Sequence, residues 1–226
     1  KPALALVGSA RIIRASTNGP AKFFKSAADG ARIDEDPDGA LRITPQNATD
    51  DAPWIFYIHG GGFLAGSPYT HLPIGSHLAA FTGRRTYMPT YRLAPEHPFP
   101  AGRDDLYRAY DSFVAAHGAP AAICGDSAGG NLALLLAQHI RDAGRPAPGA
   151  LALMSPVADL SEDVDARVRG APDEMLFPRH RLHPIRDTYL PGPDPRAPGA
   201  SPPLGALTGL PPTPAPPSAA QAAAPP

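Results

Sequence analysis

The sequence predicts an α/β fold in which a mostly parallel sheet carries helices on both faces. Short apolar runs typical of buried parallel strands recur along the chain, as at 54–58 and 151–154. Segments with apolar residues at helical spacing, such as 106–117, lie between such runs. Because strands alternate with helices, the connections are expected to be right-handed crossovers, which place helices on both faces of the sheet.

The expected elements follow one another in a strand–helix order. Residues 40–44 form an early strand after the turn at 36–39, which reads Asp-Pro-Asp-Gly. The spacing of Ile74, Leu78 and Phe81 predicts a helix. The remaining expected strands are 54–58, 86–90, 121–124 and 151–154, and the remaining expected helices are 106–117, 132–140 and 179–189.

The most informative motif is Gly125-Asp126-Ser127-Ala128-Gly129, between an apolar run and a helix. This G-x-S-x-G arrangement is typical of a nucleophile elbow, a sharp turn that lifts the serine out of the sheet and makes Ser127 the candidate nucleophile. Gly125 and Gly129 are needed where the strand and helix backbones approach closely. The N–H of Ala128 lies at a helix N-terminus, which favours negative charge. Asp126 either holds the elbow through hydrogen bonds or caps the helix.

Two further segments come before the elbow. Residues 54–63 read WIFYIHGGGF, an apolar strand followed by three glycines. The triple glycine lets backbone N–H groups point into open space, which supplies the other half of an oxyanion hole. Residues 91–100 read YRLAPEHPFP and lie between the glycines and the elbow.

Together these segments resemble the hormone-sensitive lipase family of α/β-hydrolases, in its bacterial ester-cleaving branch, family IV. That family carries HGGG, YRLAPE and GDSAGG in this order, and the resemblance covers about residues 31–213. It implies an incomplete α/β-hydrolase fold whose last strands are missing, and a serine carboxylesterase that cleaves a small-molecule acyl ester through an acyl-enzyme. By position, Ser127 matches the nucleophile, and Gly61, Gly62 and Ala128 match the oxyanion donors.

The resemblance also implies supporting residues around the site. His59 matches the motif histidine, which is structural in this family. Phe63 and Leu64 line part of the substrate pocket. Arg92 and Glu96 order the loop beneath the site, or form an ordinary surface ion pair of little energetic weight.

The residues that should activate Ser127 are not found downstream. In α/β-hydrolases the acid and the histidine follow the serine along the chain, but residues 213–226 hold no Asp, Glu or His. We expect this Pro- and Ala-rich segment to be a disordered tail. His139 lies about 18 Å along a helix from Ser127, too far to take its proton. His180 and His183 fall in an Arg-rich stretch that resembles a solvated helix face.

Three functions are open for this chain. The first is a carboxylesterase that is impaired because the triad acid and histidine are absent, an ending that a truncated gene or a shifted reading frame would produce. The second is a catalytically dead ligand-binding protein on the same scaffold, and the third is a non-functional fragment with an unpaired sheet edge. A trypsin-like protease, which carries a similar Gly-Asp-Ser-Gly-Gly, is set aside because Ser127 opens a helical stretch and the chain has one cysteine.

Composition sets further expectations. The chain has 226 residues and a formal net charge of −1, which fits one domain and gives no electrostatic case for nucleic acid. It contains no run of eighteen apolar residues, so no membrane span is predicted. Cys124 is expected to be a buried core thiol without a disulfide. No cofactor or metal site is expected. The oligomeric state is open, because relatives often pair through a last strand that is missing here.

Three regions are expected along the chain. Residues 1–30 form a partial N-terminal cap or lead-in, residues 31–212 the α/β-hydrolase core, and residues 213–226 the tail. The first ten residues resemble a signal peptide only faintly, because their apolar part is short. We therefore expect a fragment of a longer N-terminal region and a cytoplasmic enzyme, with secretion as the alternative.

Overall fold

The structure is a computed structural model, and it describes residues 12, 14–16, 27–28, 30–161 and 182–214. Its strands are β1 Arg32–Glu35, β2 Leu41–Thr44, β3 Trp54–Ile58, β4 Arg85–Met88, β5 Ala122–Asp126 and β6 Leu151–Met154. Its helices are α2 Leu72–Thr82, α3 Ala101–His117, α4 Ala128–Asp142 and α6 Leu182–Tyr189, with a short 3-10 turn, η2, at Pro202–Leu204.

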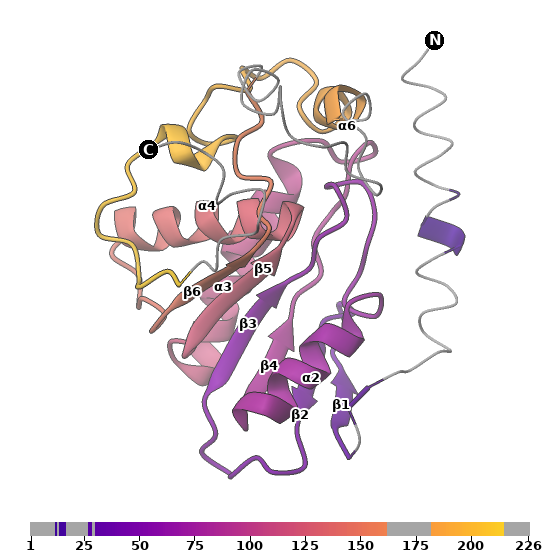
Figure 1. The fold of residues 1–226 in the computed structure, drawn as a ribbon, viewed down its shortest axis with the longest axis vertical. Helices are drawn as coiled ribbons and strands as arrows, with labels where there is room; N and C mark the ends of the chain where they lie inside the picture. Colours follow the sequence, from indigo (N-terminus) through magenta and orange to yellow (C-terminus); the bar gives the residue numbers. More distant parts are fainter. Residues whose placement is uncertain (1–11, 13, 17–26, 29, 162–181, 215–226) are drawn as a thin grey trace.

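The strands form a six-stranded sheet in the order β1-β2-β4-β3-β5-β6 (Figure 1). β1 and β2 pair antiparallel, as do β2 and β4, whereas β4, β3, β5 and β6 all run parallel. Helix α2 covers one face of the sheet, and α3 and α4 cover the other (Figure 1). The predicted α/β fold, with its mostly parallel sheet, is confirmed.

The core has two halves because successive residues of β3 point to opposite faces of the sheet. Trp54, Phe56 and Ile58 pack in the cluster that includes α3 and α4. Ile55 and Tyr57 pack on the other side, in the cluster that includes α2. All five residues are buried, which explains why β3 reads as an unbroken apolar run.

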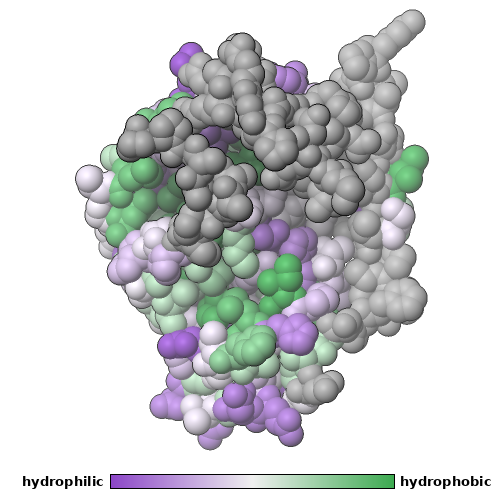
Figure 2. Space-filling view, viewed as in Figure 1, coloured by the Kyte–Doolittle hydropathy of each residue, from purple (hydrophilic) through white to green (hydrophobic). Residues whose placement is uncertain are grey.

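Helix α2 forms as predicted, but besides Leu72 it buries the small residues Gly75, Ser76 and Ala79, and of the predicted apolar residues only Leu78 packs partly against the core. Phe81 is 90% exposed and Ile74 is 44% exposed, and apolar surface gathers over α2 in the view of Figure 2. Gly75 is turned toward the sheet instead, where a Cβ would lie 2.5 Å from the sulfur of Met88. Close approach of α2 to β4 therefore requires small residues at the contact, and this requirement sets the rotation of the helix.

The chain after η2 runs beside α4 to the outer edge of β6. Arg141 donates to the carbonyl oxygens of Ala206 (2.7 Å) and Thr208 (2.9 Å). The N–H of Leu151 at the start of β6 then donates to Pro212 O (2.9 Å). The expected disordered tail, residues 213–226, lies mostly outside the described residues and stays a prediction, as does the partial N-terminal cap.

Two smaller observations concern predictions made from composition. Cys124 is buried and free of any disulfide, as predicted, and burial raises the pKa of its thiol to about 12. Among the helices that the structure describes, none is both long enough and apolar enough to cross a membrane.

Candidate active site

Ser127 occupies a strained corner between β5 and α4. Its φ is 51° and its ψ is −120°, a combination that residues with a side chain rarely adopt. The last residue of β6 and the loop that follows it hold this corner from both sides. Ser127 N–H donates to Met154 O (2.9 Å), and Ser127 O accepts from the N–H of Val157 (3.0 Å). Backbone strain held by its surroundings in this way is typical of functional sites.

Glycine is required on both sides of Ser127 because two backbones meet there. A Cβ at Gly129 would lie 2.5 Å from His59 O and closer still to Ile58 O. A Cβ at Gly125 would lie 2.6 Å from the carbonyl carbon of Gly129. The first turn of α4 therefore lies directly against the end of β3 and the start of the glycine loop.

The nucleophile and the expected oxyanion donors have no hydrogen-bond partner among the described residues. The Ser127 side chain is partly exposed, and its Oγ has no hydrogen-bond partner in the described part of the chain. The N–H groups of Gly61, Gly62 and Ala128 likewise donate to no acceptor among these residues. An attacking oxygen and free donors are the two elements that acyl transfer needs at its reacting carbonyl.

Asp126 connects the elbow to the glycine loop. Its Oδ1 accepts hydrogen bonds from the hydroxyl of Tyr57 (2.8 Å) and the N–H of Gly60 (2.9 Å). Helix α4 has no side-chain cap, so of the two expectations for Asp126 the structure shows the hydrogen bonding and not the capping. Burial acts to raise the pKa of Asp126, but His71, Tyr57 and Gly60 outweigh it and hold the pKa below its usual value. The carboxylate is thus ionised at neutral pH.

The glycine loop after β3 has a left-handed backbone over three successive residues. The φ angles are 122° at Gly61, 62° at Gly62 and 63° at Phe63. Gly61 O accepts the N–H groups of Leu64 (3.2 Å) and Ala65 (3.0 Å), which closes the loop into a turn. This conformation explains why glycines stand here, since most side chains strain such a backbone.

Helix α6 covers the glycine loop and its apolar neighbours. The ring of Phe63 stacks on that of Tyr189, with the ring centroids 3.9 Å apart and an angle of 7° between the ring planes. A Cβ at Gly62 would meet Ile185 at 3.6 Å. Phe63 and Leu64, the expected pocket residues, are 2% and 9% exposed. In this arrangement both side chains belong to the core cluster, and their role as pocket residues stays a prediction.

The motif histidine, His59, is a buried and neutral ring. It stacks on the ring of Tyr91 with the ring centroids 4.4 Å apart, and the Tyr91 hydroxyl donates to His59 O (2.8 Å). Its Nδ1 lies 2.7 Å from Gly60 O, and because a carbonyl can only accept, Nδ1 carries the hydrogen. Burial lowers the pKa of His59 to about 3, and a positive charge on the neighbouring His71 would act in the same direction. The ring therefore supports the loop as a neutral donor.

The depressed pKa of His59 predicts that acid destabilises the fold. Below a pH of about 6.5 the unfolded histidine takes up a proton, while the folded one stays neutral until a pH of about 3. Between pH 7 and pH 5 this group alone should lower the free energy of unfolding by about 2 kcal/mol. Urea unfolding at several pH values measures the slope of the free energy of unfolding against pH. His59→Gln should reduce it, whereas His97→Gln, at an exposed position, should not; an unchanged slope in His59→Gln would contradict the assignment.

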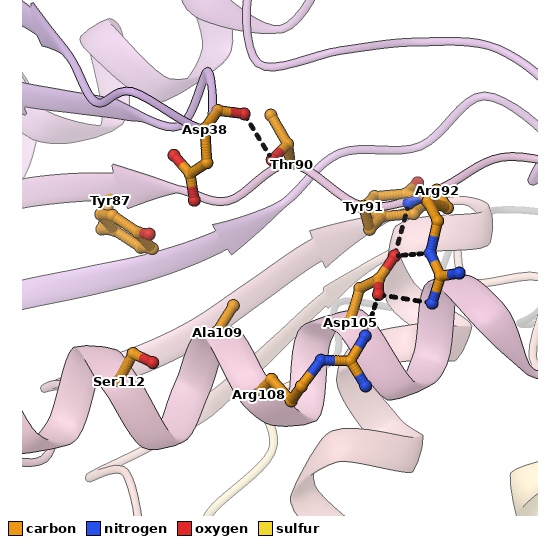
Figure 3. A pocket seen from close by; sticks show the side chains of 9 residues that line it. All are labelled: Asp38, Tyr87, Thr90, Tyr91, Arg92, Asp105, Arg108, Ala109 and Ser112. Carbon is orange, nitrogen blue, oxygen red and sulfur yellow. Dashed lines mark hydrogen bonds and ion pairs between the residues drawn. The ribbon is translucent and has the colours of Figure 1, made fainter.

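Arg92 and Glu96 order the loop after β4 through different partners. The Arg92 guanidinium pairs with Asp105 of α3 at 2.8 and 2.9 Å, and the Arg92 backbone N–H donates to the same carboxylate (Figure 3). Glu96 pairs with Arg14 at 2.5 Å. The alternative of an ion pair between Arg92 and Glu96 is not what the structure shows. Asp105 instead fixes the loop that carries Tyr91.

A cavity of about 450 Å³ lies beside this ion pair, between β4 and α3 (Figure 3). Its lining includes Tyr87, Asp105 and Arg108 but neither Ser127 nor the glycine loop. Asp105 binds the guanidinium groups of both Arg92 and Arg108, so the charges of this cavity are largely paired with one another. The cavity is separate from the elbow.

Within the described ranges, no catalytic base reaches Ser127. None of the described histidines or carboxylates hydrogen bonds to its Oγ. His139 is stacked on Tyr107 at 3.9 Å, between α4 and α3. His183 lies on α6, and His180 lies outside the described residues.

Sequence reasoning did not single out two residues that organise the site. Asn131 is fully buried, and its Nδ2 donates to the carbonyl oxygens of Val157 (3.0 Å), Ala158 (3.2 Å) and Ala200 (3.1 Å). The sequence feature that could have indicated Asn131 is its amide side chain within an otherwise apolar stretch of helix. The second residue, His71, precedes α2 and faces Asp126. Its position after the glycine loop gave no indication of that partner.

Comparisons with known proteins agree with this geometry. A family model described as an alpha/beta hydrolase fold matches residues 55–214. An acetyl-hydrolase of Streptomyces hygroscopicus is 39% identical over 168 residues, covering 73% of this chain and 56% of the relative. A putative acetyl-hydrolase of Mycobacterium tuberculosis is 35% identical over 173 residues, covering 76% and 56%. A solved hormone-sensitive lipase from a metagenome library has a TM-score of 0.78 and 31% identity, covering 91% of this chain and 70% of that one. The chain thus spans about half the length of the curated relatives it matches.

Proposed function

The chain belongs to the α/β-hydrolase fold family, and from this premise we propose that it is a serine carboxylic-ester hydrolase with Ser127 as its nucleophile. The observation that carries the proposal is the strained backbone of Ser127, a residue with φ 51° held at a strand-to-helix corner. The N–H groups of Gly61, Gly62 and Ala128, which donate to no acceptor in the described part of the chain, support it. Because two of the matched relatives are named acetyl-hydrolases, the proposed substrates are esters of short acyl groups.

The proposed reaction has two steps. The Ser127 oxygen attacks the acyl carbon while a base takes its proton, and the carbonyl oxygen becomes an oxyanion held by the N–H groups of Gly61, Gly62 and Ala128. The ester C–O bond then breaks, the alcohol leaves with the proton, and the acyl group remains on Ser127. In the second step water attacks the acyl-enzyme, releasing the acid and restoring the hydroxyl.

We also propose that the chain of 226 residues removes the proton of the Ser127 hydroxyl only slowly. A base must lie within hydrogen-bond reach of Oγ, and none of the described side chains does so. Residues 184–226 contain no histidine at all. Oxyanion stabilisation and binding alone typically leave about 10³- to 10⁴-fold acceleration over water. The expected behaviour is slow acylation, and binding without turnover is the second candidate function that this observation favours.

A fluorophosphonate probe tests the assignment, because it forms a covalent adduct only with an accessible, reactive serine oxygen. The intact chain should be labelled at Ser127, and Ser127→Ala should not be labelled. Ser112→Ala, at an exposed position on α3, should be labelled at the rate of the intact chain.

Hydrolysis of p-nitrophenyl acetate, followed in parallel, distinguishes the two proposals. With a base present, Ser127→Ala should lower kcat by about 10⁶-fold, and without one the loss should be far smaller. Equal labelling of the intact chain and Ser127→Ala would remove Ser127 as the nucleophile.

A further inference from the structure

The carboxylate of Asp126 is held by groups from three separate parts of the fold. Its Oδ1 accepts from Tyr57 on β3 and from the Gly60 N–H at the start of the glycine loop. Its Oδ2 lies 3.5 Å from Nε2 of His71, the residue directly before α2. The side chains of His71 and Asp126 are only 16% and 22% exposed, so solvent weakens their attraction less than at an open surface.

The glycine loop and Asp126 are packed so closely that no side chain fits between them. A Cβ at Gly60 would lie 2.8 Å from Asp126 O and closer to Asp126 Oδ2. Small shifts of the carboxylate are therefore transmitted to the Gly60 backbone. Gly61 and Gly62 follow directly along the chain, and their N–H groups are the proposed oxyanion donors.

The ring of His71 is fixed on its other side as well. Its Nδ1 lies 2.8 Å from Thr70 Oγ1 and 3.4 Å from Ser67 O. The Thr70 hydroxyl also donates to Ser67 O (2.9 Å), so this side chain is itself held in place. A hydrogen on Nε2 of His71 gives the Asp126 carboxylate an N–H, whether or not Nδ1 also carries a hydrogen. The neutral form with a bare Nε2 would place two acceptors against each other.

We infer that His71 is a positioning residue that, through Asp126, sets the spacing between the two halves of the oxyanion hole. One half, the N–H of Ala128, follows Asp126 by two residues on the elbow. The other half, at Gly61 and Gly62, follows the Gly60 N–H that the same carboxylate holds. His71 limits the freedom of that carboxylate from the side of α2. This inference rests on the proposed function for its catalytic consequence but not for its structural one.

The expected catalytic consequence is a loss of rate without a loss of binding. A misplacement of about 1 Å in a catalytic group can lower a rate by about 10²-fold, and loss of one of three restraints on Asp126 should have a smaller effect. We expect His71→Leu to lower the maximal rate of fluorophosphonate labelling of Ser127 about tenfold with unchanged probe affinity. His71→Gln, which keeps an N–H donor, should recover part of that rate.

A second readout does not depend on chemistry at Ser127. Amide hydrogen exchange at Gly60 reports directly on its bond to Asp126, and His71→Leu should speed it about tenfold. The matched control is His77→Leu, an exposed histidine on α2, which should leave both the exchange and the labelling at the level of the intact chain. Gly60 exchange that is the same in His71→Leu and in the intact chain would overturn the inference.

The two readouts separate failure of the inference from failure of the proposed function. If the intact chain is not labelled at all, the proposed function fails, and Gly60 exchange still decides the role of His71. If His71→Leu does not fold, Asp126→Asn, His71→Gln and their double variant replace it. Coupled residues predict a double variant no faster in exchange than the faster single one, whereas additive effects would contradict the coupling.

Discussion

Gly129→Ala is expected to lower the free energy of unfolding by about 3 kcal/mol or more and to abolish labelling of Ser127. The added Cβ would lie 2.5 Å from His59 O and closer to Ile58 O. Both oxygens belong to the backbone at the end of β3, which is buried along its whole length and paired on both sides. Neither can rotate away as a side chain would, so α4 or β3 must shift. Urea unfolding followed by circular dichroism measures the loss.

The matched control for this substitution is Gly199→Ala. The nearest atom to a Cβ at Gly199 would be a guanidinium nitrogen of Arg103, at 3.3 Å. Because this nitrogen is at the end of a flexible side chain, it can move away. Its φ lies outside the left-handed region, so alanine there should change stability by no more than about 0.5 kcal/mol. If both alanine variants were equally stable, α4 would not be packed against β3 as tightly as the structure shows.

Asn131→Asp is expected to destabilise the protein by about 3 kcal/mol or more at neutral pH, although the two side chains have nearly the same shape. The amide donates to three carbonyl oxygens in a fully buried position. A carboxylate would face those oxygens with an acceptor and a negative charge. Burial would raise the pKa of the introduced acid, so its loss of stability should grow as pH rises above about 4, the value for an unfolded aspartate.

Urea unfolding at pH 4 and pH 7 measures that difference. Asn47→Asp is the matched control, because Asn47 is exposed and its amide reaches only Ala80 O, at 3.4 Å. That variant should stay within about 0.5 kcal/mol of the intact chain at both values. A loss of stability in Asn131→Asp that does not depend on pH would mean that the missing N–H donor causes it and that the introduced charge does not.

The strands that were predicted to the residue are β3, which is buried on both faces, and β6, whose first and third residues are buried. β3 and β6 at 54–58 and 151–154 are short apolar runs, and both lie in the parallel part of the sheet. β1, which reads Arg-Ile-Asp-Glu at 32–35, was not predicted. It is an edge strand with one apolar residue, and charged side chains are typical of exposed edges. Its pairing with β2 creates a strand that its own composition does not indicate.

The site shows the same division between local and distant constraints. The elbow could be predicted because the needs for glycine at 125 and 129 arise within a few residues of Ser127. The partners of Asp126 and Asn131 could not, because they come from loops and helices that only the folded chain brings together. Arg92 shows this most clearly. A carboxylate four residues away suggested a partner, yet its guanidinium binds Asp105 on α3.

The bonds from α4 to residues 202–208 affect how a protease would meet this chain. Gln138 donates to Pro202 O (2.9 Å) and Ala206 O (3.2 Å), and Arg141 holds Ala206 and Thr208. A protease binds its target as a freely extended strand, so cutting here requires that these carbonyls first leave the helix. Resistance of this proline-rich stretch to digestion would thus report that the end of α4 is intact, far from the serine at its beginning.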